Sequence, residues 1–181
     1  MPSKNKTSNS PMVDVVGPNL LSNLEKTEST TTVMKGKDLV MLYFSASWCP
    51  PCKKFTPLLA DFYTNHCVKN NIEIVYISSD TDIPSFNEYY GTMPWKSIPP
   101  MESAHIKQKL ADRLKISGIP TLVVLDAKTG HFVSDWAKDE VVVAGSSDEK
   151  CAEVIKQWKE KESVPIEEAK LSGAGKGGIL S

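Results

Sequence analysis

The chain alternates continuous apolar runs with stretches in which apolar residues recur three or four positions apart. A short apolar run is typical of a strand buried on both faces, and spacing of three or four is typical of a helix with one buried face. The sequence therefore predicts strands at 39–46, 72–78 and 121–126 and helices at 50–67, 82–90, 104–115 and 147–161. Strands that alternate with helices predict an α/β fold, with helices on both faces of a central sheet.

Weaker patterns lie between and beside these elements. We expect a short N-terminal hairpin from Leu20 to Met34 and a proline-rich loop at 93–101. A strand near 131–136 and a further strand near 140–144 complete the predicted sheet.

The two ends of the chain differ in composition from its middle. The first residues are rich in Ser, Asn, Lys and Thr, and the last are rich in Gly, so both ends have little apolar surface to bury. We expect a disordered N-terminal segment at 1–16, one domain at 17–165 and a flexible C-terminal tail at 166–181. A length of 181 residues with 40% hydrophobic residues fits a single domain with a sizeable core.

Composition excludes several function classes. A net charge of −1 gives no electrostatic reason to bind nucleic acid or an anionic membrane. No apolar run approaches the ~18 residues of a membrane span, and no apolar run follows the first lysines as in a secretory signal. Four cysteines are too few for a disulfide-stapled secreted scaffold. We therefore expect a cytoplasmic protein.

The strongest chemical signal is Trp48-Cys49-Pro50-Pro51-Cys52. It lies where a predicted strand leads into a predicted helix, so Cys49 is expected at or just before the first helical turn. Unpaired backbone N–H groups and the helix dipole stabilise a thiolate there, and lower the pKa of such a cysteine from ~8.5 into the range of ~3.5–7.5. Proline suits the first turn because the N–H that it lacks would have no helical partner. This placement predicts a redox dithiol, with Cys49 more accessible and more nucleophilic than Cys52.

A cysteine pair with this spacing has two other possible uses. A zinc site needs a second ligand pair, but Cys67 and Cys151 stand alone and His66, His105 and His131 are scattered, so no metal is expected. A purely structural disulfide within Cys-x-x-Cys would close a loop too small to constrain the unfolded chain much.

The remaining singled-out side chains have simpler interpretations. Cys151 falls on the apolar stripe of the last predicted helix and Cys67 near the end of the dithiol helix, so we predict packing roles, with regulation by Cys67 as the alternative. His66 and His105 are expected to be solvated helix residues. Trp48 directly precedes the reactive cysteine, so we expect it to cover the active-site surface rather than to lie in the core.

A second motif supports the redox interpretation. Ser117–Leu122 reads Ser-Gly-Ile-Pro-Thr-Leu, between a predicted helix and a predicted strand. It resembles the cis-proline segment that faces the dithiol in the thioredoxin superfamily, which implies a cis bond between Ile119 and Pro120. Pro57 matches the proline that kinks the family's first helix.

Longer stretches are similar to the tryparedoxin and nucleoredoxin branch of that superfamily. They are Tyr43–Cys52 continued by Phe55-Thr56-Pro57, Ile77–Asp80 and Met93-Pro94-Trp95. The similarity covers roughly residues 18 to 160. It implies a thioredoxin fold, in which helices flank both faces of a central mixed β-sheet, extended by the N-terminal hairpin.

This resemblance also implies a function, the reduction of protein disulfides. Cys49 would attack the partner's disulfide and Cys52 would release the reduced partner. The implied substrate-binding residues are Trp48, Pro50, Pro51, Trp95, Ile119 and Pro120, with loop anchoring as an equal alternative for Trp95. Implied clients are peroxidases of the peroxiredoxin type, and implied electron donors are trypanothione, glutathione or a flavoprotein reductase. We expect a monomer without a bound cofactor, because the cysteines themselves carry the electrons.

The nucleoredoxin resemblance implies an alternative function. The same dithiol could control association with a signalling partner, with little turnover. Both functions use Cys49, so the residues alone do not separate them.

The sequence departs from ordinary thioredoxins at Tyr43. Thioredoxins bury an aspartate at this position, six residues before the nucleophile, and it is thought to help deprotonate the resolving cysteine. Tyrosine, with a pKa near ~10, is a poor base at neutral pH. The proton of Cys52 would then pass to water, to the departing thiolate or to a carboxylate. Asp80 is the best-placed carboxylate, although capping of the next helix is its favoured role.

Overall fold

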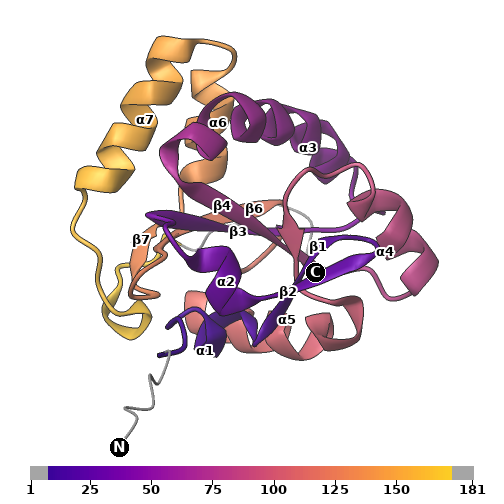
Figure 1. The fold of residues 1–181 in the computed structure, drawn as a ribbon. Helices are drawn as coiled ribbons and strands as arrows, with labels where there is room; N and C mark the ends of the chain where they lie inside the picture. Colours follow the sequence, from indigo (N-terminus) through magenta and orange to yellow (C-terminus); the bar gives the residue numbers. More distant parts are fainter. Residues whose placement is uncertain (1–7, 173–181) are drawn as a thin grey trace, which may run out of the picture.

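A computed structural model describes residues 8–172. Its centre is a seven-stranded mixed sheet in the order β2-β1-β5-β4-β3-β6-β7 (Figure 1). The strands are β1 (Asn19–Asn23), β2 (Lys26–Ser29), β3 (Leu39–Ser45), β4 (Ile72–Ser78), β5 (Lys96–Ser97), β6 (Thr121–Asp126) and β7 (Phe132–Ser134). The α-helices are α1 (Val13–Val16), α2 (Thr30–Met34), α3 (Pro50–Phe62), α4 (Ile83–Tyr90), α5 (Pro100–Leu114), α6 (Ala137–Ala144) and α7 (Asp148–Glu160).

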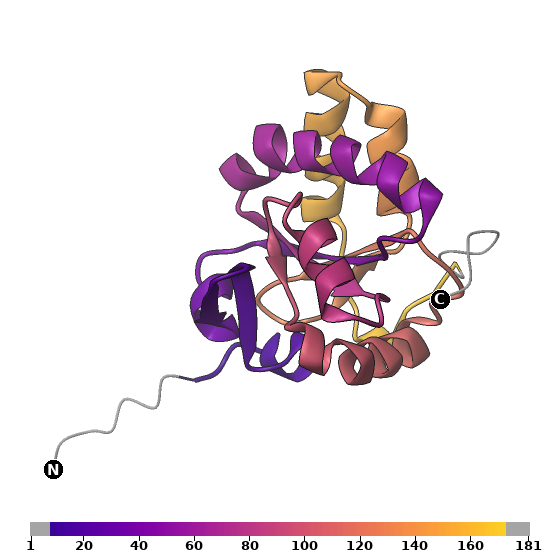
Figure 2. The same cartoon turned by 90° about the vertical axis from the view of Figure 1, so that its right-hand side faces the viewer.

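The central strand β3 is buried along its whole length. It pairs in parallel with β4 and antiparallel with β6. Successive side chains of a strand point to opposite faces, so Met41 and Tyr43 lie in one hydrophobic cluster with Leu59 of α3. Leu42 lies in a second cluster with Leu110 of α5. Figures 1 and 2 show α3, α6 and α7 on one side of the sheet and α1 and α5 on the other, which confirms the predicted α/β arrangement.

Most predicted elements are confirmed. The strands at 72–78 and 121–126 have the predicted bounds, and β3 ends one residue before the predicted strand does. The predicted helix at 50–67 is α3 continued by a π-helical turn, η1 (Tyr63–Cys67). The predicted N-terminal hairpin consists of β1 and β2, but its last residues form α2.

The predicted strand near 140–144 is wrong, because these residues belong to α6. Ala137, Val141 and Ala144 are buried at helical spacing, whereas Val142 and Val143 are exposed. Consecutive valines favour a strand by local propensity. Packing of one helical stripe against the sheet overrides that preference.

The second half of the predicted disordered segment 1–16 is ordered. Met12, Val15 and Val16 are buried, and Gly17, with φ +87°, ends the short helix α1. The apolar side chains join the cluster that contains Leu110 of α5. Residues 1–7 lie outside the described part of the chain.

The C-terminal segment also packs beyond its predicted boundary at 165. Phe132 of β7 exchanges backbone hydrogen bonds with Val164, at 2.7 and 3.0 Å, so the tail covers the edge of the sheet. Ile166 is buried, and Glu167 accepts a hydrogen bond from Arg113 at 2.8 Å. The predicted flexible tail is therefore packed at its start, and its residues 173–181 lie outside the described range.

Candidate active site

The dithiol lies where β3 leads into α3, with Cys49 just before the helix and Cys52 in its first turn. Cys49 is the N-cap of α3, with extended backbone angles, and the prolines of the motif occupy the first helical turn. The Sγ atom of Cys49 accepts a hydrogen bond from the backbone N–H of Cys52 at 3.3 Å. This N–H is one of those that a helix leaves without a partner. The two cysteines are joined as a disulfide, with Cα atoms 5.2 Å apart.

Both cysteines are buried in this oxidised form, each with 0% of its surface exposed. The predicted surface accessibility of Cys49 is therefore wrong for the disulfide state. Cys49 lies in the hydrophobic cluster that includes Ala46 and Ile119. The exposed parts of the motif are its prolines and Trp48, which is 48% exposed.

The proline segment lies next to the end of β3. The bond between Ile119 and Pro120 is cis, as the resemblance implied. Thr121, the first residue of β6, pairs with Phe44, and its hydroxyl donates to the carbonyl of Gly118 at 2.7 Å. Antiparallel pairing of β6 with β3 thus brings the predicted cis-proline segment to the same end of the sheet as the dithiol.

Asp80 holds the loop that precedes the dithiol. Its Oδ1 atom accepts hydrogen bonds from the backbone N–H and the hydroxyl of Ser47, at 3.0 and 2.6 Å. Asp82, not Asp80, caps the following helix, through the N–H of Ser85 at 2.8 Å. The favoured capping role of Asp80 is therefore wrong, and none of its described hydrogen bonds joins it to Cys52.

Tyr43 belongs to a buried cluster of hydroxyl groups beside Cys52. Its hydroxyl lies 2.7 Å from the Oγ1 atom of Thr56, which donates to the carbonyl of Cys52 at 3.0 Å. The hydroxyl of Tyr89, on α4, is 2.6 Å from the same Oγ1 atom and 2.9 Å from the Oγ atom of Ser45. Burial raises the pKa of Tyr43 well above its ordinary value. The side chain at this position is therefore a neutral hydrogen-bonding group at neutral pH.

Comparison with known proteins agrees with this geometry. A family model described as thioredoxin-like matches residues 36–132. The chain belongs to the thioredoxin-like family. It is 44% identical over 103 residues to a tryparedoxin of Trypanosoma brucei brucei, across 57% of this chain and 71% of that protein. It is 38% identical over 136 residues to a nucleoredoxin of Danio rerio, across 73% of this chain but 31% of that longer protein.

Solved structures of this family share the fold. Native tryparedoxin I from Crithidia fasciculata aligns with a TM-score of 0.70 and 31% identity, over 77% of this chain and 95% of that one. Tryparedoxin II in complex with glutathionylspermidine aligns with a TM-score of 0.68 and 32% identity, over 77% of this chain and 98% of that one. The mixed sheet with its two helical layers is therefore a thioredoxin fold, in the tryparedoxin and nucleoredoxin branch.

Within this family fold, Trp95 is part of the core and not of the surface. Its side chain is fully buried, edge-on to the rings of Tyr43 and Tyr63, with ring centroids 5.8 Å apart in each case. The hydroxyl of Tyr90 donates to the Trp95 carbonyl at 2.8 Å. These contacts agree with the alternative expectation, in which Trp95 anchors its loop. They contradict the predicted contact of the Trp95 indole with a partner.

The other cysteines and histidines lie away from the dithiol. Cys67 and Cys151 are buried, as predicted, and burial raises the pKa of both thiols. His105 is exposed. The predicted solvation of His66 is wrong, since the residue is 5% exposed and its Nε2 atom lies 3.3 Å from Asp148 of α7. In residues 8–172, no three His, Cys, Asp or Glu side chains group in a way that could hold a metal ion.

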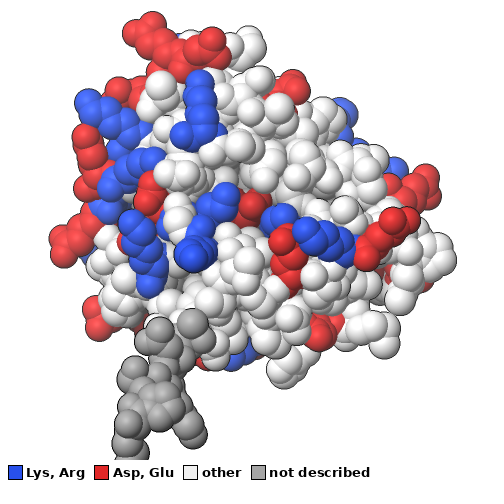
Figure 3. Space-filling view, viewed as in Figure 1, with Lys and Arg blue, Asp and Glu red and all other residues white. Residues whose placement is uncertain are grey.

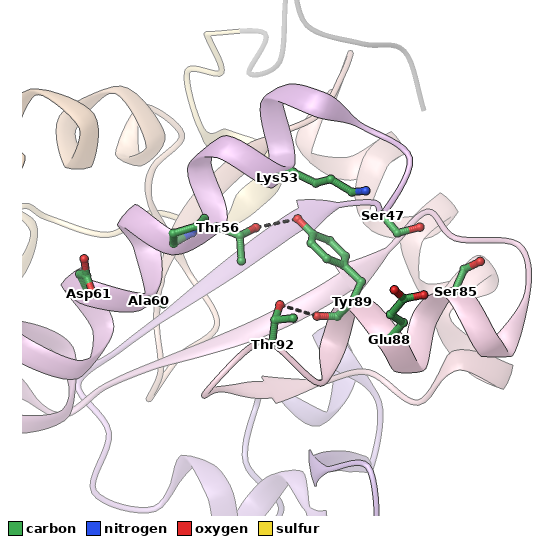
Figure 4. Close-up of a pocket in the computed structure, with 10 residues that line it drawn as sticks. Ser47, Lys53, Thr56, Ala60, Asp61, Ser85, Glu88, Tyr89 and Thr92 are labelled. Atoms are coloured by element: carbon green, nitrogen blue, oxygen red, sulfur yellow. Dashed lines mark hydrogen bonds between the residues drawn. The ribbon is translucent and has the colours of Figure 1, made fainter.

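Sequence reasoning missed a pocket of about 640 Å³ between α3 and α4 (Figure 4). Its lining residues are Ser47, Lys53, Thr56, Pro57, Ala60, Asp61, Ser85, Glu88, Tyr89 and Thr92. In Figure 4, Tyr89 points from α4 towards Thr56 on α3. The two helices come from separate stretches of the chain, so no local motif announces the pocket.

Charges are mixed on the face shown in Figure 3, where basic and acidic side chains are interspersed. Several form ion pairs, such as Lys128 with Asp38 at 3.2 Å and Lys96 with Glu28 at 3.2 Å. Among the helices in residues 8–172, none is long and apolar enough to cross a membrane.

Proposed function

We propose that this protein is a thiol–disulfide oxidoreductase that reduces disulfides in partner proteins. The observation that carries the proposal is the hydrogen bond from the Cys52 N–H to the Cys49 Sγ atom at the N-terminus of α3. A helix N-terminus favours negative charge, so this contact stabilises a Cys49 thiolate once the disulfide is reduced. Cys49 is therefore the attacking residue.

The reaction proceeds by two exchanges. The Cys49 thiolate attacks one sulfur of the partner disulfide, a mixed disulfide forms, and the other partner sulfur leaves with the electron pair. Cys52 then loses its proton and attacks the Cys49 sulfur. The Cys49–Cys52 bond forms, the second partner sulfur leaves as a thiolate, and the partner is reduced while the dithiol is oxidised.

The exposed surface around the dithiol provides the partner contact. Trp48 is half exposed beside Cys49, and Pro50 and Pro51 are exposed in the first turn of α3. Ile119 and Pro120 lie at the same end of the sheet but are buried, so they would offer their backbone rather than their side chains to an extended strand of the partner. These residues define the proposed docking surface.

The relatives suggest the partners. We propose peroxidases of the peroxiredoxin type as clients and a small thiol as electron donor, such as trypanothione or glutathione, with a flavoprotein reductase as the other candidate. Similarity to a tryparedoxin that was solved in complex with glutathionylspermidine supports the small-thiol donor. The protein would act as a monomer in the cytoplasm, without a bound cofactor.

Similarity to nucleoredoxin favours a second candidate function. The dithiol would then control the binding of a signalling partner, with little turnover. Catalytic reduction of insulin disulfides in the presence of dithiothreitol supports the reductase, and a stoichiometric complex without turnover supports the binding protein.

Trapping experiments test the reductase directly. The Cys52→Ser variant should accumulate stable mixed disulfides with partners, because Cys49 attacks and nothing resolves the product. The Cys49→Ser variant serves as the matched control and should trap none. Equal trapping by the two variants, or trapping by Cys49→Ser alone, would contradict the proposed roles.

A further inference from the structure

The hydroxyl cluster beside Cys52 joins three elements of the fold. Tyr43 and Ser45 belong to β3, Thr56 belongs to α3, and Tyr89 belongs to α4. All four side chains are buried, and their hydroxyl contacts are 2.6 to 2.9 Å long. Figure 4 shows the contact between Thr56 and Tyr89.

Counting donors gives the direction of every hydrogen bond in the cluster. A threonine hydroxyl has one proton and two acceptor sites. Two hydroxyl groups reach the carbonyl of Cys52, that of Thr56 at 3.0 Å and that of Tyr43 at 3.5 Å. We assign the shorter bond to the proton of Thr56, and Thr56 then accepts from both tyrosines. The Tyr89 proton is then committed to Thr56, and Ser45 must donate to Tyr89. The hydrogen bonds therefore run in one direction. Ser45 donates to Tyr89, both tyrosines donate to Thr56, and Thr56 donates to the carbonyl of Cys52.

We propose that Thr56, supported by Tyr89, is a positioning residue for Cys52 in the resolving step. This inference rests on the proposed function, in which Cys52 attacks the mixed disulfide on Cys49. The bond from Thr56 fixes the first turn of α3, and with it the place of Cys52 relative to Cys49. The oriented hydroxyl groups also stabilise the negative charge that Cys52 carries once it has lost its proton, before it attacks.

The cluster does not accept the proton of Cys52. Both acceptor sites of Thr56 are filled by the tyrosines, and its proton is directed away to the Cys52 carbonyl. The printed contacts of the cluster with Cys52 go to its carbonyl oxygen and not to its sulfur. On our proposal, the Cys52 proton leaves to solvent or to the departing thiolate. In this protein, a fixed set of neutral dipoles stands where ordinary thioredoxins have a buried carboxylate.

An aromatic disulfide separates the two chemical steps in one experiment. Reduced protein is mixed with 5,5′-dithiobis(2-nitrobenzoate) under single-turnover conditions. Attack by Cys49 forms a mixed disulfide and releases one coloured thiolate. Attack by Cys52 on the Cys49 sulfur then closes the Cys49–Cys52 bond and releases the second thiolate. The first phase reports on Cys49, and the second phase reports on Cys52.

The decisive variant is Thr56→Val, which keeps the shape of the side chain and removes its hydroxyl. We expect the second phase to slow by roughly three- to tenfold, the effect of about one hydrogen bond on a rate, while the first phase keeps its wild-type rate. Thr56→Ser, which retains the hydroxyl, should restore the second phase. Tyr89→Phe should slow the second phase to a smaller extent, because the bond from Thr56 to Cys52 persists.

Thr92→Val is the matched control. Thr92 lines the same pocket, but its hydroxyl donates to the backbone carbonyl of Tyr89 at 2.7 Å and takes no part in the cluster. Both phases should keep their wild-type rates in this variant.

Other outcomes overturn the inference. An unchanged second phase in Thr56→Val, equal slowing of both phases, or a Thr56→Ser variant as slow as Thr56→Val would each do so. If wild-type protein released no second thiolate, the proposed function itself would fail, and this result is distinct from all of the others.

Discussion

The helical segment from Pro50 to Cys67 has a cysteine pair near each of its ends. Cys49 and Cys52 lie at its N-terminus, whereas Cys67 ends the π-helical turn and lies in one hydrophobic cluster with Cys151 of α7. All four are buried, so burial alone does not distinguish the pairs. At the N-terminus, the Cys49 sulfur accepts a hydrogen bond from the backbone N–H of Cys52, which has no helical partner.

The surroundings of Cys67, at the other end of the segment, disfavour a thiolate. Burial and then the nearby Glu73 carboxylate raise the pKa of the Cys67 thiol. The C-terminus of a helix also disfavours negative charge. On our proposal, the position of a cysteine relative to the helix ends, rather than its exposure, decides whether it serves redox chemistry or packing.

The largest expected effect separates the two pairs by activity. Cys49→Ser should reduce the catalysed reduction of insulin by dithiothreitol to the uncatalysed background, because it removes the nucleophile. Cys67→Ala should keep the wild-type rate. Insulin turbidity measures both rates. Residual turnover in Cys49→Ser, or its loss in a folded Cys67→Ala variant, would break the comparison.

Tyr43→Asp tests whether a buried carboxylate beside the dithiol would accelerate disulfide reduction. The change removes a buried aromatic ring, and large-to-small changes in a core cost ~3–5 kcal/mol. Burial would also raise the pKa of the new carboxyl group and keep it protonated over a wider pH range. We expect a lower free energy of unfolding in urea and a disulfide-reduction rate near neutral pH that is unchanged or lower.

Tyr43→Phe is the control for Tyr43→Asp, since it keeps the ring. A folded Tyr43→Asp protein that reduced its partner severalfold faster would show that the tyrosine limits the resolving step. That result would contradict our account of how Cys52 loses its proton.

A smaller expected effect is the pH dependence of stability that comes from Glu73, which lies near Cys67. Burial raises the pKa of Glu73 above 4.5, although the N–H of Ile74 and the hydroxyl of Tyr63 partly oppose this shift. The folded state therefore binds more protons than the unfolded state above pH 4.5. This contribution to stability is complete below that pH and is lost as the pH rises through the raised pKa.

Glu73→Gln should remove this loss, so its free energy of unfolding should fall less than that of the wild type between pH 4.5 and 7. Glu28→Gln is the control of opposite sign, because hydrogen bonds from Ser22 and Lys96 lower the pKa of Glu28 to about 2. The slope of its pH profile should differ from that of the wild type only below pH 4.5, where the wild type loses the stability that ionised Glu28 contributes. Urea unfolding across this pH range measures both, and identical pH profiles for Glu73→Gln and wild type would refute the assignment.

The central strands and the dithiol could be predicted from the sequence for local reasons. β4 and β6 are buried on both faces, so each is a continuous apolar run whose bounds are visible in the sequence. The position of the Cys49–Cys52 motif at a helix N-terminus could be predicted because the strand before it and the helix after it are adjacent in the chain. The cis bond between Ile119 and Pro120 could be predicted only from family resemblance.

What could not be predicted depends on contacts between distant residues. The valines of α6 favour a strand until the packing of the helix on the sheet is known. Met12 and Val16 are ordered because α5 and its neighbours cover them, although their local sequence resembles that of a disordered end. The hydroxyl cluster joins Ser45 and Tyr89, which are 44 positions apart, so spacing along the chain gives no signal for it.

The central claim is that Cys49, at the N-terminus of α3, is the reactive thiol although all four cysteines are buried in the oxidised protein. Alkylation of the fully reduced protein with limiting iodoacetamide at neutral pH, followed by peptide mass mapping, tests it most directly. Our account predicts that Cys49 is labelled first and fastest, before Cys52, and that Cys67 and Cys151 are labelled only after unfolding. Labelling of Cys52 or Cys67 ahead of Cys49 would contradict it.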